Sequence, residues 1–149
     1  NPHRVMRALE ICIGTGIPYA VFKNKPKKPR NFQTINIGLN ADRDIIYQRI
    51  NQRVDEMMEN GLLEEAKGLF PNKELNALQT VGYRELFSFF EGNSTKEFAI
   101  SEIKKNSRRF AKRQLTWFKR DSATLWFDYL TTPSQIISKI SEKINAFKN

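Results

Sequence analysis

A dense group of basic residues lies in the second half of the chain, where their spacing could serve anion binding. Between Lys104 and Arg120 there are eight basic residues and no acidic one. At helical spacing they form two adjacent rows, Lys104, Arg108, Lys112 and Lys105, Arg109, Arg113. Like charges at this spacing repel by a few tenths of a kcal/mol per pair. A solvated helix face is the ordinary interpretation, but the missing acidic residues favour a phosphate backbone or a polyphosphate as the partner.

Two smaller basic groups could also bind anions. Arg49 and Arg53 lie one helical turn apart, and two guanidinium groups on one face could hold a diphosphate. The acidic residues around them make an exposed ion pair the simpler interpretation. His3, Arg4 and Arg7 lie at a predicted helix start, where backbone N–H groups add to an anion site.

Composition excludes several other chemistries. The chain has 149 residues, a formal net charge of +9, one cysteine and one histidine. These leave no intrachain disulfide, too few soft ligands for structural zinc, and no Ser/His/Asp set. The sequence contains neither a Gly-x4-Gly-Lys-Ser/Thr loop nor a Gly-x-Gly-x-x-Gly loop, the two common glycine-rich phosphate-binding motifs. No apolar run reaches the roughly 18 residues of a membrane span. We expect a cytoplasmic protein that makes no membrane contact and binds a polyanion.

Apolar periodicity predicts a mainly α-helical fold with one or two short β-strands. Asp42 should cap the helix that carries Arg49 and Arg53, and Ser94 to Glu97 form a capping box for the long basic helix. Cys12 is expected to be a small core residue. The predicted helices are 2–13, 42–60, 62–70, 83–90, 94–120 and 132–147, with strands at 32–39 and 125–130. The side of the long helix expected to be buried carries Ile100, Ile103, Phe110, Trp117 and Phe118.

Five motifs in order along the chain resemble the bacterial tRNA dimethylallyltransferases, also called tRNA isopentenyltransferases. They are Arg7-Ala-Leu-Glu10, Arg49-Ile-x-x-Arg53, Glu56-Met-x-x-x-Gly61-Leu, Thr80-Val-Gly82-Tyr-x-Glu85 and Ala111-Lys-Arg-Gln-x-Thr-Trp117-Phe. The last motif is the most distinctive. The resemblance covers nearly the whole chain and is to the C-terminal half of such an enzyme.

The resemblance implies transfer of a dimethylallyl group from dimethylallyl diphosphate to N6 of the adenosine 3′-adjacent to the anticodon of tRNA. It also implies a P-loop-type α/β core with a helical insertion, and a target adenosine that is flipped into the core. Residues 1–30 would be the end of that insertion and a basic connector, and 31–149 the C-terminal part of the core. The family's P-loop, its general base and the Mg²⁺ that binds with them belong to the missing N-terminal half. We therefore expect no catalytic residue or metal ligand in this chain, and no activity from it alone.

The resemblance also assigns binding residues. Arg53, with Arg49 as a second candidate, would hold the diphosphate. The segments that match the family's contacts to the tRNA anticodon stem-loop are His3, Arg4, Val5, Met6, Arg7; Gln79, Thr80, Val81, Gly82, Tyr83, Arg84; and Asn106, Ser107, Arg108, Arg109, Phe110, Ala111, Lys112, Arg113.

Two alternatives stay open on the sequence. An adenylate isopentenyltransferase would act on a free nucleotide and has less need of a long basic helix. A non-catalytic basic helical RNA-binding module would account for the charge but not for the ordered motifs.

Overall fold

The computed structural model describes residues 2–23 and 30–148. The described chain divides into two compact units, with the division between Thr34 and Ile35. Most of the predicted basic connector, residues 24–29, lies outside the described residues. The assignment of the two parts to a helical insertion and a catalytic core stays a prediction.

The first unit contains two helices, α1 (Pro2–Thr15) and α2 (Tyr19–Lys23). Gly16 ends α1 with a φ of +66°, and its N–H donates to the carbonyl of Cys12 at 2.9 Å. The Cys12 sulfur, half-buried, accepts a hydrogen bond from the Tyr19 N–H at 3.3 Å. Helix α1 is as predicted, whereas α2 was not anticipated from the sequence. Its start follows Pro18, whose fixed φ suits the first turn of a helix.

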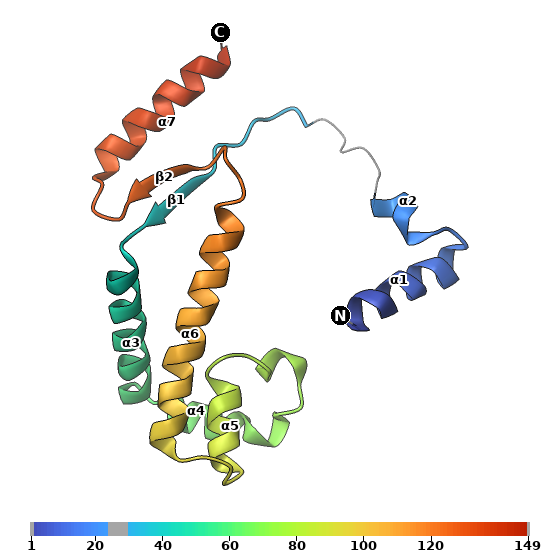
Figure 1. Cartoon of the computed structure of the whole chain (residues 1–149), viewed down its shortest axis with the longest axis vertical. Helices are drawn as coiled ribbons and strands as arrows, with labels where there is room; N and C mark the ends of the chain where they lie inside the picture. Colours follow the sequence, from blue (N-terminus) through green and yellow to red (C-terminus); the bar gives the residue numbers. More distant parts are fainter. Residues whose placement is uncertain (1, 24–29, 149) are drawn as a thin grey trace. The chain divides into compact units, whose positions relative to one another are not determined.

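The core of the second unit lies among four helices (Figure 1). They are α3 (Arg43–Glu59), α4 (Leu62–Leu69), α5 (Tyr83–Phe90) and α6 (Lys96–Phe118). Two short 3₁₀ turns, Phe70–Asn72 and Asn76–Leu78, connect α4 to α5. Helix α6 packs against both α3 and α5. The buried side chains of this core are Val54, Leu62, Ala66, Leu86, Phe87, Ala99 and Ile103.

Two short strands, β1 (Ile37–Asn40) and β2 (Leu125–Asp128), pair in parallel. The register sets Gly38 opposite Trp126. The indole covers the Gly38 backbone so closely that a Cβ there would lie 2.5 Å from ring carbons. Glycine is therefore the residue that lets this aromatic side chain lie across the strand pair. The observed fold is mainly helical with two short strands, which confirms the predicted fold class.

The last helix, α7 (Pro133–Lys148), begins at the predicted capping box. The Thr132 hydroxyl accepts from the Gln135 N–H at 3.4 Å, and the Gln135 side chain accepts from the Thr132 N–H at 3.1 Å.

Three details of the elements differ from the prediction. The first strand is shorter than 32–39, because pairing with β2 begins only where Leu125 donates to the Asn36 carbonyl. Asp42 stands at the N-cap position of α3 but makes no side-chain cap bond. Thr95, not Ser94, caps α6, because its hydroxyl accepts from the N–H three residues ahead, at Phe98.

The predicted buried side of α6 is wrong for its second half. Ile103 is buried and Ile100 packs against the core, but Phe110, Trp117 and Phe118 are 56%, 64% and 45% exposed. The four-helix core ends near Ile103, and beyond it no second layer among the described residues covers these aromatic rings. They share that exposure with strand β1, where Ile37 is 44% exposed and Leu39 58% exposed.

Candidate functional site

The first basic row of α6 faces α3. The Lys104 ammonium lies 2.6 Å from an Asp55 carboxylate oxygen, and the Arg108 guanidinium donates to the Asn51 side-chain oxygen at 2.6 Å. Arg108 also lies over the Tyr47 ring. Part of the like-charge repulsion that suggested an external anion is thus relieved within the chain. Of this row, only Lys112 lacks a side-chain hydrogen bond or ion pair among the described residues.

The second row turns outward. Lys105 pairs with Glu102 at 2.7 Å, and the exposed Arg109 donates to the Asn106 side-chain oxygen at 3.3 Å. Arg113 is exposed, and the described residues provide no acidic partner for it. Arg109 and Arg113 of this row and Lys112 at the end of the first row are thus exposed basic residues of one stretch of α6, and the Phe110 ring in this stretch is exposed as well. We call these three basic residues the outer face of α6.

The turn at 79–84 is held by three anchors. Gln79 donates its side-chain amide to the Lys73 carbonyl at 2.7 Å, and the Tyr83 hydroxyl donates to Glu65. This hydrogen bond, reinforced by burial, raises the pKa of Tyr83. Gly82 has a φ of +106°, which an L-residue rarely adopts, and its N–H donates to Glu85 at 2.9 Å.

These anchors leave a defined set of groups for a partner. Val81 is half-buried and packs on the core, whereas Gln79, Thr80 and Arg84 are exposed. Only Arg84 among them carries a charge, and no ion pair involves it in the part of the chain that the structure describes. The turn can thus offer one cation and several hydrogen-bonding groups.

The N-terminal cluster lies on the first turns of α1, in the first compact unit. His3, Arg4, Val5, Met6 and Arg7 are all exposed. Arg7 donates to Glu10 at 2.9 Å, an exposed ion pair worth little in water.

The two arginines of α3 differ in their surroundings. The guanidinium of Arg49 lies 4.4 Å from the centre of the Tyr129 ring, a cation–π contact that fixes its position. Arg53 is exposed and makes no ion pair among the described residues. The pair therefore combines one anchored and one available guanidinium on neighbouring turns.

Arg49 borders a pocket of about 250 Å³ at the carboxyl ends of the two parallel strands. Asn40 ends β1 and Tyr129 follows β2, and both line this pocket. The Asn40 side-chain oxygen is buried and has no hydrogen-bond partner. Ligands of open α/β sheets bind at this edge. Sequence reasoning missed Asn40 and Tyr129, although Asn40 directly follows the first predicted strand and Tyr129 lies near the end of the second, which is the signal that could have found them.

Metal and membrane chemistry gain no support from side chains of the described residues. They contain no group of three or more His, Cys, Asp or Glu side chains that could hold a metal ion. Among them, no helix combines the length and apolar character needed to cross a membrane.

The second unit thus combines four helices with a parallel strand pair and carries exposed basic side chains along α6 and α3. Residues 1–121 match the model of the IPP transferase family, and the chain belongs to this family. The resemblance seen in the sequence motifs is thereby confirmed.

The relatives agree with this assignment. A tRNA dimethylallyltransferase of Flavobacterium psychrophilum is 64% identical over 144 residues, which are 97% of this chain and 47% of that protein. The crystal structure of a tRNA delta(2)-isopentenylpyrophosphate transferase from Staphylococcus epidermidis matches with a TM-score of 0.70 and 34% identity, over 98% of this chain and 49% of that one. The structure of a eukaryotic dimethylallyltransferase acting on tRNA matches with a TM-score of 0.74 and 28% identity. The match covers 97% of this chain and 41% of that one. The chain spans about half the length of the curated relatives it matches.

Proposed function

We propose that this chain is the tRNA-binding and diphosphate-binding part of a tRNA dimethylallyltransferase of the cytoplasm. The whole protein would transfer a dimethylallyl group from dimethylallyl diphosphate to N6 of the adenosine 3′-adjacent to the anticodon. Family membership and the names of the relatives support the reaction. The observation that carries the role of this part is the outer face of α6, where Arg109, Lys112 and Arg113 have no acidic partner among the described residues.

The outer face of α6 would bind phosphates of the anticodon stem-loop. Three exposed cations on one helix suit a phosphate backbone, and the exposed Phe110 ring among them can stack on an unpaired base. The turn at 79–84, with Arg84, and the cluster His3 to Arg7 would add further contacts.

The arginines of α3 would act on the leaving group. In the transfer, adenine N6 forms a bond to C1 of the dimethylallyl group as the C1–O bond breaks, and N6 loses a proton. The electron pair of the C1–O bond goes to the diphosphate. Arg53 and Arg49 would stabilise the negative charge that develops there. The proton would go to a base in the N-terminal half of the protein, which would also supply the P-loop and bind Mg²⁺.

The proposal is tested by binding of a fluorescent anticodon stem-loop across a salt series. The protein is made at the full length of its relatives, as wild type, as Arg109→Gln/Arg113→Gln, and as the control Lys104→Gln/Lys105→Gln, so that both double variants lose two positive charges. The control changes two cations of the same helix that already pair with Asp55 and Glu102.

The wild type should bind with a steep salt dependence. The slope of log affinity against log salt changes by about 0.9 for each phosphate contact to a duplex, so loss of two contacts lowers it by about 1.8. The slope of the control should fall by clearly less than that of the Arg109/Arg113 variant. Equal losses in the two double variants, or a wild type with no salt dependence, would reject the outer face as an RNA surface.

A further inference from the structure

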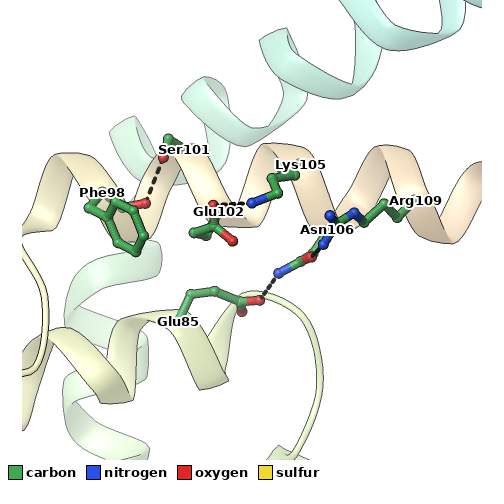
Figure 2. A network of polar contacts seen from close by, with 7 residues as sticks. All are labelled: Glu85, Phe98, Ser101, Glu102, Lys105, Asn106 and Arg109. Carbon is green, nitrogen blue, oxygen red and sulfur yellow. Dashed lines mark hydrogen bonds and ion pairs between the residues drawn. The ribbon is translucent and has the colours of Figure 1, made fainter.

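The carboxylate of Glu85 connects two segments that lie apart in the sequence. One of its oxygens accepts from the Gly82 N–H at 2.9 Å, which closes the 79–84 turn at the start of α5. The other accepts from the side-chain amide of Asn106 on α6 at 2.8 Å. Figure 2 shows Asn106 between Glu85 and Arg109, directed toward both. Arg109 completes the chain by donating to the Asn106 oxygen at 3.3 Å.

The hydrogen bonds from Arg109 to Asn106 and from Asn106 to Glu85 allow only one orientation of the Asn106 amide. An ionised carboxylate only accepts hydrogen bonds, so Asn106 must direct its NH₂ group toward Glu85. Its oxygen then faces away and meets the Arg109 guanidinium, which can only donate. If Asn106 were flipped, two donors would face each other at Arg109. The ionised state of Glu85 therefore determines how Arg109 is held.

The two segments also share a surface. Arg84 of the turn and Asn106 of α6 border the same pocket of about 230 Å³, together with Glu85. The hydrogen bonds from Gly82 and Asn106 to Glu85 are partly buried, so water competes with them less than with exposed ones. The hydrogen bonds at Glu85 are thus shielded from water, whereas the hydrogen bond from Arg109 to Asn106 is exposed.

We propose that Glu85 and Asn106 are positioning residues that join the 79–84 turn and the outer face of α6 into one preformed RNA-binding surface. The inference rests on the proposed function. Neither residue needs to touch RNA: Glu85 sets the turn and the orientation of Asn106, and Asn106 sets Arg109. A long arginine side chain that is already held loses less conformational freedom when RNA binds.

The test exploits a sign difference. Glu85→Gln removes a negative charge, so electrostatics alone predicts tighter RNA binding. Positioning predicts weaker binding, because the introduced glutamine amide can donate to the Asn106 oxygen and flip that side chain against Arg109. Immobilising one freed side chain on binding corresponds to about a two- to tenfold loss of affinity. The control Glu102→Gln makes the same charge change on the neighbouring helix α6 and breaks only the pair with Lys105.

A second substitution, at Asn106, should restore matching hydrogen-bond donors and acceptors between residues 85, 106 and 109. Asn106→Asp alone places two carboxylates together and should weaken binding. In the double variant Glu85→Gln/Asn106→Asp, the new amide donates to the new carboxylate, which again accepts from Arg109. We expect affinity for the stem-loop within about twofold of wild type. Should Glu85→Gln unfold, Asn106→Leu leaves the hydrogen bond from the Gly82 N–H to Glu85 in place, removes the contacts of Asn106 to Glu85 and Arg109, and should also weaken binding.

The measurement is stem-loop affinity of the full-length variants at one salt concentration. Weaker binding by Glu85→Gln than by Glu102→Gln, with recovery in the double variant, supports the inference. Binding by Glu85→Gln as tight as that of Glu102→Gln, or a folded double variant that does not recover, overturns it while the proposed function stands. A wild type that does not bind the stem-loop overturns both.

Discussion

Replacement of Leu86 by alanine tests the packing that positions the candidate RNA-binding segments. Leu86 is 0% exposed and lies in α5, one residue after Glu85, so its burial keeps α5 on the core. The substitution removes three carbon atoms, which at about 0.8 kcal/mol each gives about 2.4 kcal/mol of lost transfer free energy. The cavity left behind adds up to about 2 kcal/mol, depending on how far the neighbours collapse. The expected loss in the free energy of unfolding is thus about 2.5–4.5 kcal/mol.

The assay is urea unfolding of the full-length protein followed by far-UV circular dichroism. Leu75→Ala is the matched control, because Leu75 is 58% exposed and the same atoms are removed. Its effect should stay within about 0.5 kcal/mol. The reasoning is refuted if Leu86→Ala costs less than about 1 kcal/mol or no more than the control. In that case α5 would not be fixed on the core, and Glu85 could not be held beside Asn106.

Two further predictions concern the strand pair. Gly38→Ala should destabilise it and shift the fluorescence of Trp126, because the added Cβ would lie 2.5 Å from ring carbons of that indole; unchanged emission and stability would contradict the close approach. Asp121 accepts hydrogen bonds from the Ala123 N–H and the Asn36 side chain, which lower the pKa of its carboxyl. The pKa of Asp121 is lower in the folded than in the unfolded protein. The ionised carboxylate therefore stabilises the fold fully above the unfolded-state pKa, and this contribution is lost as pH falls through the folded-state pKa. A carboxyl ¹³C titration should show a midpoint below the ordinary value of about 3.9, and a midpoint at or above it would contradict the contact.

The helices could be predicted because each repeats apolar residues at helical spacing and most have clear ends. Helix α3 is an example: the pattern from Ile46 to Met58 and the Asn60-Gly61 stop predict nearly its observed range. Short elements were less accessible. Helix α2 has only five residues, too few for a periodic pattern. The cap of α6 was misplaced by one residue because Ser94 and Thr95 are chemically equivalent candidates.

Burial of the second half of α6 could not be read from its pattern. Trp117 and Phe118 are apolar, but whether a ring is covered depends on what packs against it, and little among the described residues covers these two. The same holds for Leu39, which has the alternation of a strand with a buried face and is 58% exposed. An amphipathic pattern predicts a face that needs a partner, not the presence of that partner.

The basic rows of α6 were visible in the sequence, but their division was not. Arg108 is held by Asn51, 57 positions away, while Arg113 has no such partner among the described residues. The link between Glu85 and Asn106 crosses 21 positions and depends on how α5 and α6 pack. Residue types and spacing thus predicted which cations to consider, and only tertiary contacts separated those held by the fold from those available to a partner.

The central claim is tested most directly by transfer of a labelled dimethylallyl group from its diphosphate to tRNA. We expect the full-length protein to form N6-dimethylallyladenosine beside the anticodon, and the 149-residue chain alone to form none at any concentration. Turnover by the pure 149-residue chain would contradict the division of labour between the two halves. Modification of free adenosine monophosphate but not tRNA by the full-length protein would contradict the substrate.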